Sequence, residues 1–130
     1  MIYLDTCIVI YLVEGEADVA EPIRQRLAAA GNSCAASHLT RLECRVLPLR
    51  EHNEALLARY EAFFTAPELV MLGLAAEVFE LAAGIRAAHR TATPDALHLA
   101  TAIHAGCEEF WTNDLRLAPA AEGRISLVTP

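Results

Sequence analysis

Aspartate is rare in this chain, and most of its copies lie where an acid can take part in chemistry. The four are Asp5, Asp18, Asp95 and Asp114. Asp5 and Asp114 each follow a short apolar run, and Asp95 lies in the helix-start sequence Thr-Pro-Asp. Glu43 lies within a helical pattern in the first half of the chain. Four carboxylates from distant segments can therefore converge on one site if the fold permits it.

A cluster of these acids would need a cation. Neighbouring carboxylates raise one another's pKa, so their ionised forms are unfavourable together unless a positive charge compensates. Mg²⁺ prefers a few carboxylates and completes its shell with water and substrate phosphate. Such ions activate water and stabilise the leaving oxygen when a phosphodiester is cleaved. Taken singly, however, each acid is an ordinary solvated residue at a helix start or strand end.

The composition excludes several other chemistries. All ten basic residues are arginine, so mechanisms that need lysine, such as a P-loop, a Schiff base or a Ser-Lys pair, are excluded. The net charge of -7 argues against a protein that coats DNA with a basic face. Hydrophobic residues make up 55% of the chain, which excludes wholesale disorder. The length of 130 residues predicts one domain spanning residues 1–130.

Short apolar runs alternate with helical segments along the chain. Strands are expected at residues 1–5, 33–37, 69–72, 109–112 and 125–128. Helices are expected at residues 6–13, 17–30, 39–47, 53–64, 75–89 and 93–105. This alternation predicts an α/β fold with a central parallel sheet flanked by helices on both faces. Ligands bind such sheets at the carboxyl ends of the strands, which is where Asp5 and Asp114 are expected.

Local signals refine three of these helices. Thr93 is expected to cap the helix that contains Asp95, with proline at its first position. Pro22 is expected in the first turn of its own helix. Phe79 is expected to face inward together with Val78.

The cysteines and the apolar runs bear on where the protein works. Cys7, Cys34, Cys44 and Cys107 form neither a CxxC pair nor a zinc-binding spacing. The chain begins with a strand pattern rather than a secretory signal, and no apolar run is long enough to span a membrane. We therefore expect reduced cysteines in a cytoplasmic protein with no membrane contact.

Four segments resemble, in order, the motifs of the PIN-domain ribonucleases, particularly the VapC toxins of bacterial toxin–antitoxin pairs. They are IYLDTCIVI at the start, LTRLECRVLPLR in the middle, TPDALHLATA, and FWTNDLRL near the end. The resemblance covers nearly the whole chain, and the four segments in this order and spacing are specific for the superfamily. The segment ECRVLPLR followed by Tyr60, Phe63 and Phe64 resembles VapC more than eukaryotic PIN domains.

The resemblance implies a set of site residues. The family's catalytic, metal-binding acids, which hold Mg²⁺ or Mn²⁺, fall on Asp5, Glu43, Asp95 and Asp114. It also implies that Thr112 lies beside the metal site with Asn113 near it. Thr6 stands where the family commonly has Ser or Thr after the first Asp. Cys7 is a departure, because Ser or Asn is more common there.

The resemblance further implies a function and partners. It implies a metal-dependent endoribonuclease that acts as a toxin, leaving a 5′-phosphate and a 3′-hydroxyl on the cleaved RNA. The expected protein partners are a second copy in a homodimer and a VapB-like antitoxin that blocks the active site. DNA would be contacted only indirectly, through the antitoxin.

Two other functions stay open at this point. One is a housekeeping PIN nuclease that works in RNA processing without an antitoxin. The other is a non-catalytic metal-binding regulator of the response-receiver type, although such domains need a lysine that this chain lacks. A phosphatase of the haloacid-dehalogenase type would need Asp-x-Asp after the first strand, where this chain has Asp5-Thr6-Cys7.

A few further residues have two interpretations. His98 lies three residues after Asp95, so it can share a helical face with it and orient a carboxylate or contact RNA. The simpler interpretation is a histidine hydrogen-bonded within the fold. Arg41 and Arg116 are candidates for binding substrate phosphate, against the alternative of surface ion pairs. Aromatic residues at 60–64 can stack on bases, but their helical spacing favours packing.

Overall fold

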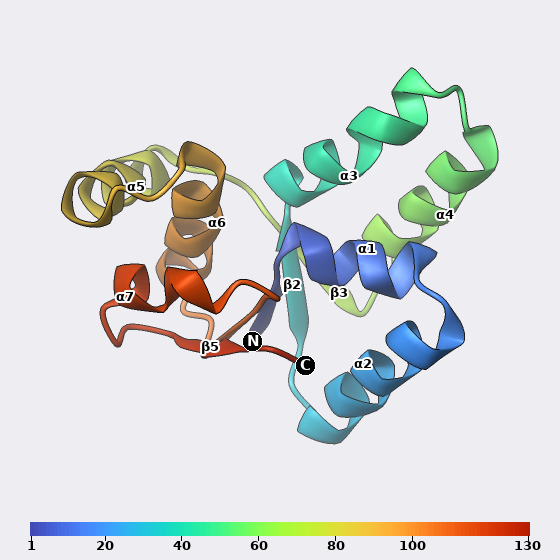
Figure 1. Cartoon of the computed structure of the whole chain (residues 1–130), viewed down its shortest axis with the longest axis horizontal. Helices are drawn as coiled ribbons and strands as arrows, with labels where there is room; N and C mark the ends of the chain where they lie inside the picture. The colour runs from blue at the N-terminus through green and yellow to red at the C-terminus, as the bar shows by residue number, and fades with distance from the viewer.

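The computed structural model describes all 130 residues and contains one five-stranded sheet (Figure 1). The strands are β1 (Ile2–Leu4), β2 (Cys34–Ser37), β3 (Leu69–Leu72), β4 (Glu109–Trp111) and β5 (Ser126–Val128). Their order in the sheet is β3-β2-β1-β4-β5, and every neighbouring pair is parallel. The predicted α/β class with a central parallel sheet is confirmed.

Helices cover both faces of the sheet, as Figure 1 shows. One face carries α1 (Thr6–Glu14), α2 (Ala17–Ala30), α3 (His38–Arg50) and α4 (Glu54–Phe64). The other carries α5 (Ala76–His89), α6 (Thr93–His104) and α7 (Ala118–Ala121), and a short 3₁₀ turn, η1 (Leu115–Leu117), precedes α7. No helix has the length and apolar character needed to cross a membrane.

The central strands are buried on both sides, which is why they are apolar without alternation. Successive side chains of a strand point to opposite faces. Ile2 and Leu4 accordingly pack among α1–α4, whereas Tyr3 packs on the side of α5–α7. Tyr3 stacks on Phe110 of β4 with ring centroids 5.3 Å apart. Two hydrophobic cores, one on each face, hold the sheet rigidly between them.

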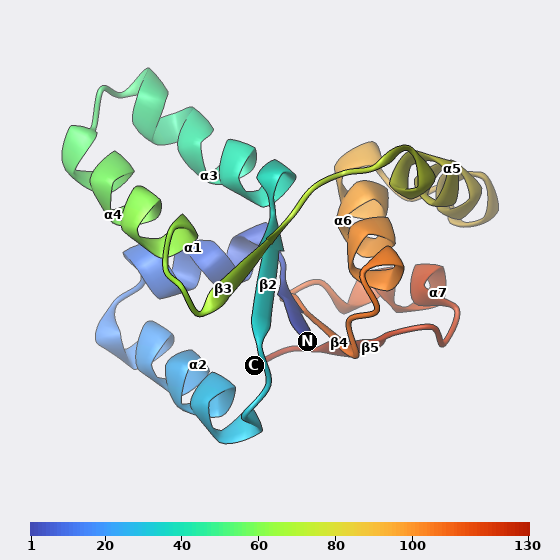
Figure 2. The same ribbon diagram turned by 180° about the vertical axis from the view of Figure 1, so that it is seen from behind.

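The strand order reverses beside β1. From β1 the chain builds β2 and β3 on one side, and it then returns to build β4 and β5 on the other (Figure 2). The register pairs Leu4 with Trp111, and the Asp5 amide donates to the Trp111 carbonyl at 3.0 Å. Asp5 and Thr112 therefore leave the sheet side by side at its carboxyl edge. This reversal is the position at which open parallel sheets bind ligands.

The helix that carries Asp95 is capped one residue earlier than predicted. Its first intrahelical bond joins the Ala96 amide to the Ala92 carbonyl at 2.9 Å, so Ala92 is the N-cap. The prediction of Thr93 as a side-chain cap is wrong, and no side chain caps this helix. Asp95 still lies in the first turn, where a negative charge interacts favourably with the helix dipole.

Two further local predictions are wrong. Pro22 lies inside α2 rather than in its first turn, with the exposed residue Asp18 four positions before it. Proline has no backbone N–H to donate to the carbonyl four residues earlier, and this carbonyl belongs to the exposed residue Asp18. Phe79 is 52% exposed, because Val78, Ala82 and Ile85 form the buried stripe and Phe79 lies about 100° around the helix from Val78.

Candidate metal centre

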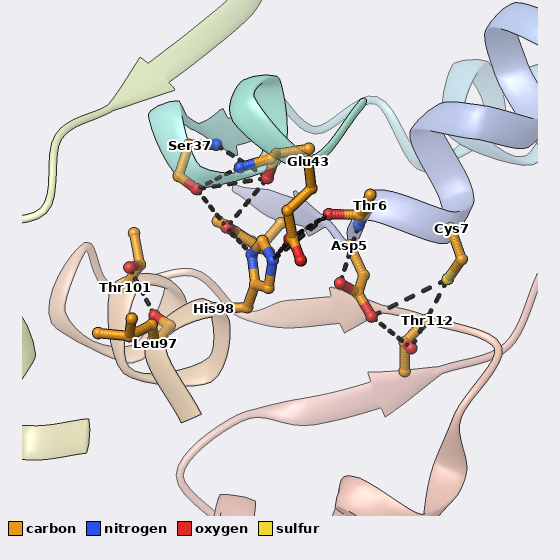
Figure 3. A network of polar contacts seen from close by, with 11 residues as sticks. Asp5, Thr6, Cys7, Ser37, Glu43, Leu97, His98, Thr101 and Thr112 are labelled. Carbon is orange, nitrogen blue, oxygen red and sulfur yellow. Dashed lines mark hydrogen bonds and ion pairs between the residues drawn. The ribbon is translucent and has the colours of Figure 1, made fainter. Parts of the chain in front are cut away.

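Asp5 is held at the start of α1 by hydrogen bonds to both of its carboxylate oxygens (Figure 3). Oδ1 accepts from the Thr6 amide at 2.8 Å, which makes Asp5 the N-cap of α1. Oδ2 accepts from the Thr112 hydroxyl at 2.8 Å, across the reversal between β1 and β4. Thr112 thus lies beside the first acid of the predicted site.

Cys7 and Asn113 occupy the outer side of Asp5. The Cys7 thiol lies 3.9 Å from Asp5 Oδ2 and 3.9 Å from the Thr112 hydroxyl. Burial raises the pKa of this thiol, so it stays protonated and acts as a weak donor. Asn113 donates its backbone amide to Cys7 Sγ at 3.5 Å and its side-chain amide to the Tyr11 hydroxyl at 2.8 Å. Asn113 therefore braces the loop against α1, and all four cysteines are free.

Glu43 extends from α3, and only one of its two carboxylate oxygens has hydrogen-bond partners in the chain. Oε1 accepts from the Thr6 hydroxyl at 2.9 Å and also contacts Nε2 of His98 (Figure 3). Burial opposes ionisation of Glu43, but the hydrogen bond and charge of His98, with the bond from Thr6, outweigh it. The pKa of Glu43 is consequently lowered, and the side chain is a carboxylate at neutral pH.

Asp95 is the acid whose ionised form is least favourable. Burial raises its pKa, and the negative charges of Asp5, Asp114 and Glu43 raise it further. The nearby His98 acts in the opposite direction without cancelling the shift. The other three acids therefore lie near enough to destabilise the charge of Asp95, although the four come from four separate segments.

Asp114 is already neutralised by an arginine. Arg116 donates from Nε to Oδ1 at 2.8 Å and from its terminal nitrogen to Oδ2 at 2.9 Å. These bonds hold the pKa of Asp114 below its usual value. Arg41 is likewise paired, with Glu61 of α4 at 2.9 Å. Both arginines are thus in the surface ion pairs that were the alternative to phosphate binding.

The acids share one edge of the sheet, but they are not arranged as a finished coordination shell. No group of three or more His, Cys, Asp or Glu side chains is placed to hold a metal ion. Oε1 of Glu43 is occupied by Thr6 and His98, and both oxygens of Asp114 are occupied by Arg116. The donor set nonetheless fits a hard divalent cation, because it offers only carboxylate oxygens whose mutual repulsion such a cation would relieve. Asp114 can join it once its pair with Arg116 opens.

The cavities of the molecule lie elsewhere. The larger, of about 420 Å³, is lined mainly by apolar residues of α1, α2, α4 and the adjoining strands, among them Leu12, Leu27 and Phe63. The second lies between α1, α2 and the C-terminus. Neither is lined by any of the four acids. The acidic edge is therefore an open surface, which suits a large substrate better than a small enclosed one.

Sequence reasoning left the role of His98 open and missed its partner Tyr3. His98 is 2% exposed, and its Nδ1 lies 2.7 Å from the Tyr3 hydroxyl while Nε2 faces Glu43. The interpretation of a histidine hydrogen-bonded within the fold is confirmed, and the carboxylate that it contacts is Glu43 rather than Asp95. The sequence did contain a signal for this contact, because Tyr3 lies in a strand expected to be buried and a buried hydroxyl needs a hydrogen-bond partner.

The repulsion at Asp95 predicts a measurable pH dependence for the metal-free protein. A carboxyl whose pKa is raised in the folded state destabilises the fold above that pKa, and the penalty disappears as the pH falls through it. In EDTA at pH 7, the Asp95→Asn variant should therefore have a higher free energy of unfolding than the natural chain. The difference should shrink on acidification toward pH 4, close to the ordinary aspartate pKa of about 3.9. Urea unfolding at several pH values measures it, and a constant difference across the range would contradict the prediction.

Comparison with known proteins identifies the fold family. The model of the PIN domain family matches residues 2–123 of the chain. No match was found among curated protein sequences.

Several solved structures share the fold at low sequence identity. VapBC2 from Rickettsia felis, solved bound to a DNA fragment from its promoter, has a TM-score of 0.80 at 19% identity, covering 98% of each chain. VapBC from Salmonella typhimurium, also bound to DNA, has a TM-score of 0.79 at 22% identity, covering 98% of this chain and 96% of that one. Mycobacterium tuberculosis VapC20, described as a toxin that cleaves the sarcin-ricin loop, has a TM-score of 0.76 at 19% identity, covering all of both chains. With its parallel sheet and the family match over residues 2–123, the chain belongs to the PIN domain family.

Proposed function

We propose that this protein is a metal-dependent endoribonuclease that uses Mg²⁺ or Mn²⁺. The observation that carries the proposal is that Asp5, Glu43 and Asp114 come close enough to Asp95, at the carboxyl edge of a PIN-domain sheet, for their charges to add to burial in raising its pKa. A cation that binds at this edge of the sheet would compensate the repulsion between the acids. The similarity to VapC20, a toxin described as cleaving the sarcin-ricin loop, supports RNA as the substrate.

The residues divide into acids and the groups that hold them. The acids proposed to bind the cation are Asp5, Glu43, Asp95 and Asp114. Thr112 and the Thr6 amide fix Asp5, and the Thr6 hydroxyl fixes Glu43. A divalent cation bound there supplies activation of water and stabilisation of the negative charge on the phosphate. If a cation takes the place of Arg116 at Asp114, the guanidinium would be free to pair with substrate phosphate at the same edge.

The proposed reaction is hydrolysis of a phosphodiester by water. The water oxygen forms a bond to phosphorus while the bond from phosphorus to the 3′ oxygen breaks. One proton of the water passes to the released 3′ oxygen, directly or through solvent. The products keep a 5′-phosphate and a 3′-hydroxyl, and the ribose 2′-hydroxyl takes no part.

Cleavage of structured RNA by the purified protein tests the proposal. We expect cleavage with Mn²⁺ or Mg²⁺, its loss in EDTA and its return when metal is restored. End-group analysis should find a 5′-phosphate and a 3′-hydroxyl. A 2′,3′-cyclic phosphate would contradict attack by water, because that product requires attack by the 2′-hydroxyl. Failure to cleave any RNA despite confirmed Mn²⁺ binding would favour a non-catalytic metal-binding regulator.

We further propose that the nuclease is the toxin of a VapBC-type pair, with a VapB-like antitoxin, and that it forms a homodimer. The similarity to VapBC2 of Rickettsia felis supports an antitoxin partner. A second support is an apolar face of α3, where Leu42, Val46 and Leu49 follow one another at helical spacing and are each between 44% and 58% exposed. Exposed apolar patches of this kind mark contacts with other protein chains. DNA would then be contacted only through the antitoxin, in keeping with the net charge of -7.

A further inference from the structure

A buried polar network runs from the sheet to Glu43. The Tyr3 hydroxyl donates to Ser37 Oγ at 2.8 Å and lies 2.7 Å from Nδ1 of His98. On its other side, His98 contacts Glu43 through Nε2. Tyr3 and Ser37 are fully buried and His98 is 2% exposed, whereas the Glu43 side chain is 30% exposed. Glu43 is therefore the solvent-facing end of an otherwise buried chain of contacts.

This network is costly to build for packing alone. Burying hydroxyl and imidazole groups is unfavourable unless each finds a partner, and apolar side chains of similar shape fill such space without that requirement. Here no buried polar side-chain atom lacks a partner, so every member is held in one orientation. At the solvent-facing end, the direction of the Glu43 side chain is therefore set by its contact with His98.

The two oxygens of Glu43 are treated differently. Oε1 accepts from the Thr6 hydroxyl and faces Nε2 of His98, which carries its proton toward the carboxylate because a carboxylate oxygen can only accept. Oε2 accepts no hydrogen bond from within the chain. Oε1 is thus hydrogen-bonded within the protein, and Oε2 is available to a ligand.

We propose that His98, held by Tyr3, is a positioning residue that orients Glu43 so that Oε2 is presented to the divalent cation. The inference rests on the proposed function, because it assumes that Glu43 is a ligand of that cation. It assigns His98 no contact with RNA or with the ion. Groups that orient metal-binding side chains in this way affect metal affinity by about 10- to 100-fold when they are removed.

Mn²⁺ affinity, measured by titration calorimetry without RNA, tests the inference. His98→Leu should weaken Mn²⁺ binding about 10- to 100-fold. His98→Gln, whose amide nitrogen can donate to Oε1, should restore affinity to within about threefold of the natural chain. His104→Leu, on the exposed end of the same helix, is the matched control and should leave affinity unchanged. Circular dichroism in EDTA establishes that each variant is folded.

A double-mutant cycle separates positioning from packing. In a Glu43→Gln background, His98→Leu should cause no further loss of Mn²⁺ affinity, because the residue through which it acts is already changed. Tyr3→Phe removes only the hydroxyl behind Nδ1 and should weaken binding by a smaller factor than His98→Leu. This variant keeps the inference testable should His98→Leu fail to fold.

Three results would overturn the inference. Natural affinity in His98→Leu, or in Tyr3→Phe if the leucine variant does not fold, would show that the network does not position Glu43. Equal losses in His98→Leu and His98→Gln, or additive losses with Glu43→Gln, would show a general packing effect. The absence of Mn²⁺ binding by the natural chain would instead overturn the proposed metal site itself, and this inference with it.

Discussion

Replacing Asp95 by Asn is expected to reduce metal-dependent RNA cleavage by about 1,000-fold or more. The substitution keeps the size of the side chain and removes one negative charge from the proposed cation site. Cations stabilise the charge that develops during phosphodiester cleavage by several kcal/mol, and each 1.4 kcal/mol corresponds to a tenfold change in rate. Initial rates on a labelled structured RNA in Mn²⁺ measure the loss.

A matched control exists within the same residue type. Asp18 is the one aspartate outside the acidic cluster, and it is exposed on α2. Asp18→Asn changes the net charge by the same amount and should leave the cleavage rate within about twofold, because exposed charges at a distance are screened by salt. Equal rates in the two variants would argue that Asp95 has no part in catalysis, and activity that survives Asp95→Asn and EDTA would indicate a contaminating nuclease.

Asp95→Asn also separates loss of function from loss of fold. In EDTA the variant should be more stable than the natural chain, since it relieves the repulsion that raises the pKa of Asp95. In excess Mn²⁺ the order should reverse, because a ligand that binds only the folded state stabilises it by an amount that rises with the logarithm of its affinity, and the natural chain is expected to bind Mn²⁺ more tightly. An inactive variant with a raised melting temperature in EDTA cannot be explained by misfolding.

The largest effect on stability is expected at Phe110. Its side chain is fully buried in β4 and stacks on Tyr3 with ring centroids 5.3 Å apart. Phe110→Ala should lower the free energy of unfolding by about 3–5 kcal/mol, since it combines lost burial with a cavity. Urea unfolding followed by circular dichroism measures it. The same change should also disturb the Tyr3 hydroxyl and, through it, His98.

Phe79 provides the corresponding control for stability. It is 52% exposed on α5, so Phe79→Ala removes little buried surface and should alter the free energy of unfolding by less than about 0.5 kcal/mol. A loss at Phe79 comparable to that at Phe110 would mean that a partner covers this face of α5 in solution, for example a second copy of the chain. Repeating the titration at different protein concentrations would distinguish that case.

The sheet and the edge that carries the acids could be predicted from the chain alone. The apolar run that became β1 was recognisable because a central strand of a parallel sheet is buried on both faces and is therefore an unbroken hydrophobic segment. Parallel strands place their carboxyl ends on one edge, so Asp5, directly after β1, and Asp114, three residues after the end of β4, were expected at that edge. This conclusion needed only local patterns and the geometry of the fold class.

Side-chain partners and exact boundaries depended on neighbours that are remote in the sequence. The position of Phe79 depended on which stripe of α5 meets α6, and the start of α6 depended on where the first backbone bond formed. Helical periodicity identifies a face only to within a residue or so on either side. Asp114 carries Arg116 as its partner two residues on, yet nothing in the local pattern distinguishes this pair from two solvated charges.

By itself, the sequence determined the α/β class, the strand ends that carry acids, and the absence of any lysine-based chemistry. Only the tertiary structure decided that Tyr3 and His98, which are 95 positions apart, meet in a buried network ending at Glu43. The physical reason is that strand and helix patterns report local burial, whereas a hydrogen bond between distant residues depends on the register of packed elements. The same packing decides which oxygen of Glu43 faces the protein and which is left for a ligand.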